Sequence, residues 1–162
     1  MEVTADELAG VVDVFGALTR SELADALAEL AFKRADELER PDDAIDDAVA
    51  SYHLVGFQPG ESGDGDDAER LLVPGPTAFP EIPEGGADLP HIMDVPERDV
   101  DREVLTAAVA DRFREESVVA IRSDNPEFID RLLDVSYELE VWGDVDVSGA
   151  RDQLVEAQEG ES

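Results

Sequence analysis

The sequence predicts a mainly helical α+β protein with one small β-hairpin between two groups of helices. Apolar residues recur at helical spacing in residues 1–55 and again in residues 99–156. The segment between them, residues 56–96, holds seven of the nine prolines and seven of the twelve glycines, which disfavours long regular elements. Two short apolar runs in that segment are typical of paired strands.

The first two helices carry clear start signals. Thr4 with Glu7 and Thr19 with Glu22 both have the spacing of a capping box, in which a threonine side chain and a glutamate side chain satisfy free backbone N–H groups. Apolar residues follow each cap at helical spacing. We expect the second helix to continue to about Leu38.

A third helix is expected after Pro41, with Asp42 or Asp43 as its cap. The apolar faces of the three helices should meet in one core. We predict that this core buries Leu27 and Leu30 of the second helix. They should face Val11 or Phe15 from the first helix, and Ile45 or Val49 from the third.

The middle of the chain predicts a hairpin followed by a strap. Strands are expected at 54–58 and 71–73, with an acidic tip at 59–70. Prolines lack the N–H that a central strand needs, so residues beyond the hairpin should cross the three-helix body in an extended form. We name residues 81–98 the strap and expect Phe79, Ile92 and Met93 to anchor this crossing.

The C-terminal third predicts helices again. Asp99 is a candidate cap for a helix running to about Ile121, and Asn125 before Pro126 is a strong start signal for the next helix. Residues 135–142 fit either a helix or a strand. Ser148 is a candidate cap for a short last helix, and residues 157–162 should form a disordered tail.

The N-terminal order of three helices and a hairpin resembles a winged helix. The stretch LTRSELADALAEL resembles the second helix of that fold, and SYHLVGF resembles the end of its third helix entering the first wing strand. The resemblance covers residues 4–80. We therefore expect a winged-helix-like unit at 1–80, the strap at 81–98, and a helical region at 99–156 that packs on the first unit.

The charge of the chain predicts adaptation to concentrated salt. Forty-two acidic residues face twelve basic ones, for a formal net charge of −30, and Lys33 is the single lysine. Such charge opposes compaction in dilute buffer, whereas molar salt screens it within a few ångströms. With ELAFKR, LLVPGPTAFP and DLPHIMDVP, the chain also resembles an uncharacterised family of small acidic haloarchaeal proteins. That resemblance implies habitat and fold but no chemistry.

Two functional classes follow from the sequence. The third helix, with the residues after it to Leu54, has four aspartates and neither lysine nor arginine, which disfavours reading of DNA bases and phosphates. We therefore expect a non-catalytic protein-interaction or regulatory module, and keep a DNA-associated winged-helix transcription regulator as the alternative. The partner is expected to be a protein, and the oligomeric state stays open.

Catalytic signals are weak. No cysteine is present, His53 and His91 lie in different segments, and no phosphate-binding or nucleophile motif occurs, so we expect neither enzymatic activity nor a cofactor or metal. Candidate interaction residues are the aromatic Trp142 and Tyr137, His91 in the strap, and the basic pair Lys33 and Arg34. The absence of a signal segment and of a long apolar run predicts a cytoplasmic protein without a membrane span.

Overall fold

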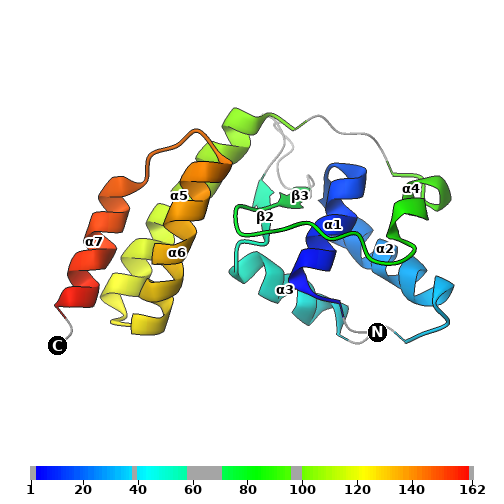
Figure 1. The fold of residues 1–162 in the computed structure, drawn as a ribbon, viewed down its shortest axis with the longest axis horizontal. Coiled ribbons are helices and arrows are strands. Elements are labelled where there is room, and N and C mark those ends of the chain that lie inside the picture. The colour runs from blue at the N-terminus through cyan, green and yellow to red at the C-terminus, as the bar shows by residue number, and fades with distance from the viewer. Residues whose placement is uncertain (1–2, 38–39, 58–70, 96–99, 161–162) are drawn as a thin grey trace. The chain divides into compact units, whose positions relative to one another are not determined.

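Helices dominate the structure, and a three-stranded antiparallel sheet accompanies them, which confirms the α+β class (Figure 1). The computed structural model describes residues 3–37, 40–57, 71–95 and 100–160. The chain divides into two compact units, residues 1–100 and residues 101–162. In the part of the chain that is described, no helix is both long and apolar enough to cross a membrane.

The first two helices of unit 1 begin where their caps predict. Helix α1 spans Ala5–Phe15 and α2 spans Arg20–Lys33, and both have a complete capping box. The Glu7 N–H donates to Thr4 Oγ1 over 3.1 Å, and Glu22 N–H donates to Thr19 Oγ1 over 3.2 Å. The expected extension of α2 to Leu38 is wrong. The helix ends at Lys33, and Ala35 takes a left-handed backbone conformation with φ of 52° that does not continue a helix.

Helix α3 spans Pro41–Ala50 and has no side-chain cap. Its N-cap residue is Arg40, in a left-handed conformation, and Pro41 occupies the first turn, where its missing N–H costs nothing. Asp42 and Asp43 lie inside the first turn, which corrects the prediction that one of them caps the helix. Their negative charges there still favour the positive end of the helix dipole.

The sheet has three strands, where the sequence predicted two. Strands β2 (Leu54–Phe57) and β3 (Leu71–Pro74) form the predicted antiparallel pair. The additional strand β1 (Leu18–Thr19) pairs with the other edge of β3, so the strand order is β1-β3-β2. Sequence patterns miss β1 because it has two residues and one of them is the cap of α2. The predicted acidic tip at 59–70 lies outside the described residues.

The core of unit 1 is aliphatic and draws on every helix. Leu27 and Leu30 are fully buried, as predicted, and so are Val11 and Ile45 from the neighbouring helices. Phe15 and Val49 pack against the same cluster with part of their surface exposed. Further members of the cluster come from α1, α2, β1, β2 and the strap: Leu8, Val12, Leu18, Leu23, Leu54 and Leu89.

The described part of the strap, residues 81–95, crosses α1 and ends beside α2 (Figure 1). The Glu81 N–H donates to the Asp6 carbonyl over 3.0 Å, and the Arg34 guanidinium donates to the Glu84 carbonyl over 3.0 and 3.2 Å. The strap is not extended throughout, because Gly86–Asp88 form a 3₁₀ turn, η1, and Leu89–Ile92 form the short helix α4.

Two of the three expected anchors are wrong. Phe79 is 76% exposed and Ile92 is 49% exposed, whereas Met93 packs against the core cluster. Leu89 of the strap is fully buried. The turn at 86–88 leads directly into α4, and that short helix presents Leu89 to the core and leaves Ile92 half exposed.

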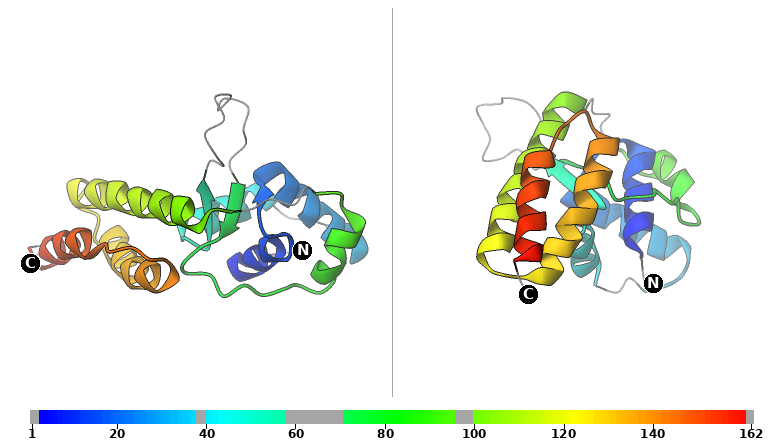
Figure 2. Two further views of the ribbon diagram at one scale, coloured as in Figure 1. Left: turned by 90° about the horizontal axis from the view of Figure 1, so that it is seen from above. Right: turned by 60° about the vertical axis from the view of Figure 1, so that its left-hand side comes forward.

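Unit 2 consists of three helices that pack side by side, α5 (Arg102–Arg122), α6 (Pro126–Trp142) and α7 (Ser148–Glu159) (Figure 2). Asp101 caps α5, which corrects the proposed cap at Asp99, a residue outside the described ranges. Asn125 caps α6 as predicted, accepting from the Phe128 N–H over 3.2 Å. The sequence of residues 135–142 fits either a helix or a strand. In the structure these residues are helical and form the last part of α6.

Helix α7 differs from the prediction at both ends. Ser148 is its first residue and not its cap, and the Asp146 carboxylate accepts from the Ser148 N–H over 2.9 Å. The helix continues to Glu159, so residues 157–159 are helical, in place of the predicted fraying. The buried residues that hold the three helices together include Leu105, Val109, Phe113, Ile129, Leu132, Leu139 and Leu154.

Candidate interaction site

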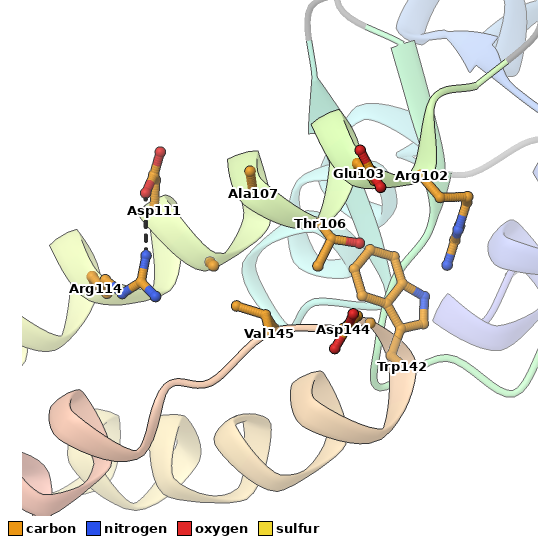
Figure 3. A pocket seen from close by; sticks show the side chains of 11 residues that line it. Arg102, Glu103, Thr106, Ala107, Asp111, Arg114, Trp142, Asp144 and Val145 are labelled. Atoms are coloured by element: carbon orange, nitrogen blue, oxygen red, sulfur yellow. Dashed lines mark hydrogen bonds and ion pairs between the residues drawn. The ribbon is translucent and has the colours of Figure 1, made fainter.

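A hollow of about 440 Å³ lies in unit 2, between the first half of α5 and the loop that follows α6 (Figure 3). Thr106 and Ala107 line it from α5, and Asp144 and Val145 line it from the loop. Trp142, the single tryptophan of the chain, stands at one end. Volumes of a few hundred Å³ with mixed polar and apolar walls are typical of ligand sites.

Two local signals bring Trp142 to this position. Helix α6 ends at Trp142 because Gly143 takes an extended conformation, and the Gly143 N–H closes the last turn on the Leu139 carbonyl over 2.9 Å. A Cβ atom on Gly143 would stand 2.6 Å from Thr106 Cγ2. The end of α6 can therefore approach α5 this closely only with glycine at position 143.

The indole of Trp142 carries a cation on its face. The Arg102 guanidinium carbon lies 4.7 Å from the ring centroid, within the range of a cation–π contact (Figure 3). Arg102 is the first residue of α5 and is exposed, whereas Trp142 is half-buried. The exposed site therefore holds a guanidinium on an aromatic surface.

The other charged residues of the hollow differ in whether they have a partner of opposite charge. Arg114, at the far end, is engaged by the Asp111 carboxylate at 3.4 Å and donates to the Asp146 carbonyl over 3.2 Å. Among the described residues, neither Glu103 nor Asp144 has a salt-bridge partner, although both line the hollow and are exposed. The hollow therefore presents two uncompensated carboxylates near one exposed arginine.

Tyr137 lies on α6 as well, but belongs to a different cluster. The Arg151 guanidinium of α7 covers its ring at 4.3 Å from the centroid. Arg151 also donates from Nε to Ser136 Oγ over 2.9 Å and pairs with Glu140, which accepts from the Val147 N–H over 3.0 Å. We call these residues, Ser136, Tyr137, Glu140, Val147 and Arg151, the Arg151 cluster.

Hydrogen bonding lowers the pKa of Glu140 within this cluster and the pKa of Asp146 beside it. The side-chain bond from Arg151, followed by the Val147 N–H, lowers the pKa of Glu140 below its ordinary value. Hydrogen bonds from Ser148, first from its side chain and then from its backbone, lower the pKa of Asp146 in the same way. Both carboxylates are therefore held in the ionised form, in which Glu140 joins α6 to the start of α7 and Asp146 caps the first turn of α7.

The sequence-predicted site residues do not form one site. Trp142 faces α5 and Tyr137 is covered by α7. In unit 1, Lys33 lies 3.4 Å from Asp88 and Arg34 binds the Glu84 carbonyl, so both residues of the basic pair contact the strap. His91 is exposed on α4.

Sequence reasoning missed Arg102, Glu103 and Asp144 as site residues. Their only local signals were the cap at Asp101, which places Arg102 and Glu103 in a first turn, and the glycine after Trp142, which ends α6. The pairing of those two helix ends depends on packing of α5 against α6, which no local pattern encodes. Among the described residues, no group of three histidine, aspartate or glutamate side chains is arranged to hold a metal ion.

Residues 6–159 match the model of a family of unknown function, DUF7109. The match covers nearly the whole chain, and the protein belongs to this family. Comparisons with curated proteins and with solved structures gave no match.

Proposed function

We propose that this protein is a non-catalytic interaction module of a salt-adapted, archaeal cytoplasm, and that unit 2 receives a protein partner at the Trp142 hollow. The observation that carries the proposal is a half-buried tryptophan at the end of a hollow of about 440 Å³. Tryptophan is one of the residue types enriched at the energetic hot spots of protein interfaces. Unit 1, with its closed aliphatic core, serves as scaffold.

The test is recovery of partners on the immobilised full chain from a host extract at high salt. We expect Trp142→Leu to abolish recovery of at least one protein that the natural chain retains. Phe32→Leu is the matched control, because Phe32 is an aromatic residue of unit 1 that is 83% exposed. Equal recovery on the natural chain and on Trp142→Leu would contradict the proposal.

Salt adaptation is part of the proposal and rests on the net charge of −30. Repulsion among exposed carboxylates weakens as salt shortens the screening length. We expect the far-UV circular dichroism of a helical protein in molar KCl and a loss of that signal in dilute buffer. A spectrum that is the same in both solutions would contradict salt adaptation.

A DNA-associated regulator is the alternative, and the order of elements favours it. Unit 1 runs α1-β1-α2-α3-β2-β3, which is the order of a winged helix, whose second and third helices form a DNA-reading pair. The surface of α3 argues against the recognition of DNA, because four exposed side chains on it are negatively charged: Asp42, Asp43, Asp46 and Asp47. The nearby cation Arg20 is already paired with Asp46 at 2.7 Å.

We therefore expect no sequence-specific duplex binding through residues 42–54. The polar side chains at the end of α3 are already in use, since Ser51 Oγ lies 2.7 Å from His53 Nδ1 and His53 Nε2 lies 3.6 Å from Asp6. Footprinting on genomic fragments tests for sequence-specific binding to duplex DNA. A footprint that Ser51→Ala or His53→Ala removes without unfolding the protein would favour the alternative.

A further inference from the structure

We infer that the Trp142 hollow takes an arginine side chain from a basic segment of a partner protein, which replaces Arg102 on the indole face. This inference rests on the proposed function and names the chemistry of the contact. It follows from three features of the described residues: the aromatic surface, the unequal charges, and the shape of the walls.

The aromatic surface already accepts a guanidinium. Arg102 lies 4.7 Å from the centre of the Trp142 ring, so the face is accessible to a planar cation and has the right surroundings for one. Arg102 has no salt-bridge partner among the described residues and is exposed. It can therefore leave the ring for water without breaking an ion pair, and a second guanidinium can take its place.

The charges of the hollow select a cation over an anion. Arg114 is compensated by Asp111, whereas the carboxylates of Glu103 and Asp144 have no such partner in the described part of the chain. Once Arg102 moves away, the space beside Trp142 is bordered by two carboxylates and no free cation. The net charge of −30 also attracts basic partners from a distance, most strongly at lower salt.

The walls suit an arginine better than a lysine. Ala107, Ala110 and Val145 contribute apolar surface to the walls of the hollow, against which the three methylenes of an arginine can lie. A guanidinium stacks on an aromatic ring and gives up water more readily than an ammonium, so it gains more on this surface. The expected order of affinity is arginine, then lysine, then the uncharged citrulline.

The fluorescence of Trp142 reports binding directly, because it is the single tryptophan. The probes are three blocked tripeptides, acetyl-Gly-X-Gly-amide, in which X is arginine, lysine or citrulline. They are titrated into the full chain at the lowest salt that preserves its circular dichroism. We expect a saturable change with the arginine peptide, weaker binding of lysine, and no saturation with citrulline, which has the same shape without the charge. Citrulline binding as tight as arginine would overturn the inference.

Variants locate the binding site. Glu103→Gln with Asp144→Asn should weaken binding of the arginine peptide by about fivefold, because the variant removes both exposed carboxylates that attract the guanidinium. The control pair, Glu115→Gln with Asp152→Asn, removes the same charge from exposed positions of unit 2 and should change binding by less than about twofold. Equal effects of the two pairs would overturn the inference, because only the overall charge would then matter.

The variant Arg102→Gln tests whether the arginine of the peptide replaces Arg102 on the Trp142 ring or binds in addition to it. Loss of the competing guanidinium should tighten binding of the arginine peptide, and unchanged or weaker binding would overturn the replacement. Failure of this inference is distinguishable from failure of the proposed function. If the arginine peptide does not saturate while partner recovery still depends on Trp142, the ligand class is wrong and the function stands. If the peptide binds and recovery is independent of Trp142, the ligand chemistry stands and the function is wrong.

Discussion

Each of the two units is stabilised internally by a different set of interactions. Unit 1 closes around an aliphatic cluster of leucine, valine and isoleucine, and its strap is fixed by bonds to backbone carbonyls and by the buried Leu89. Unit 2 buries a leucine-rich core too, but α7 is joined to α6 by an ionised pair. Burial depends little on pH, whereas an ion pair depends on both pH and salt.

This difference makes the units separable by experiment. Trp142 lies in unit 2, so its fluorescence follows that unit alone, while far-UV circular dichroism follows the helices of both. A change confined to unit 1 should alter the circular dichroism before the tryptophan signal.

The largest effect is expected in the core of unit 1. Leu27→Ala removes a fully buried side chain from a closed cluster and should lower the free energy of unfolding by about 2–5 kcal/mol. Urea denaturation in molar KCl, followed by circular dichroism, measures it. Asp25→Ala, at an exposed position of the same helix, is the control and should change stability by less than about 0.5 kcal/mol.

A close approach of backbones gives the next effect. A Cβ atom on Gly10 of α1 would stand 2.0 Å from the Glu81 carbonyl oxygen, so Gly10→Ala must push the strap away. We expect a loss of about 1–3 kcal/mol and faster proteolysis between Phe79 and Met93. Gly149→Ala is the control, because no atom lies near its Cβ position in α7. There alanine should leave the stability unchanged or raise it by less than about 0.5 kcal/mol, because position 149 lies in the first turn of the helix. If alanine stabilises the protein at both positions, the strap moves away from α1 without a cost in free energy, and the prediction is wrong.

Local patterns predicted the elements of unit 1 well because its signals are local. The capping boxes at Thr4 and Thr19 and the helical spacing of Leu27 and Leu30 each occupy a few neighbouring residues. The strap shows the limit. Its apolar residues are visible in the sequence, but whether Leu89 or Ile92 reaches the core depends on a turn at 86–88 that the prolines and glycines permit without dictating.

The candidate site was less accessible to prediction. Trp142 was identified by residue type, since tryptophan is rare and favoured at interfaces. Arg102 lies forty positions earlier, and the contact between them requires α5 and α6 to pack antiparallel with their ends in register. In a chain with 42 acidic residues, spacing alone cannot single out Glu103 and Asp144 from the rest.

The third prediction concerns the pH dependence of unit 2. Arg151 lowers the pKa of Glu140, so the pair stabilises the folded state fully above the ordinary pKa of 4.5, and this contribution is lost as pH falls through the lowered value. Arg151→Met should therefore destabilise unit 2 at neutral pH, and the difference from the natural chain should shrink below about pH 4.5. Thermal unfolding followed by Trp142 fluorescence measures it.

A comparison of two variants removes the background of other carboxylates. All acidic side chains of the chain lose repulsion as they take up protons, and this raises stability in both proteins alike. Arg131→Met, at an exposed position of α6, is the matched control and should show a pH profile parallel to that of the natural chain. If Arg151→Met gives a parallel profile as well, the Arg151 cluster does not distinguish unit 2 from unit 1.

The smallest effect is expected from the ion pair in unit 1, and it sharpens the contrast most. Lys33 lies 3.4 Å from Asp88 of the strap, but their side chains are 31% and 70% exposed, so water and salt screen the attraction. The strap keeps its other ties when this pair is lost, since Arg34 still binds the Glu84 carbonyl and Leu89 stays buried. Lys33→Met, which keeps most of the aliphatic stem, should change the free energy of unfolding by less than about 1 kcal/mol and leave strap proteolysis unchanged. If Lys33→Met exposes the strap to protease as much as Gly10→Ala does, ion pairs hold unit 1 as well, and the proposed difference between the units is wrong.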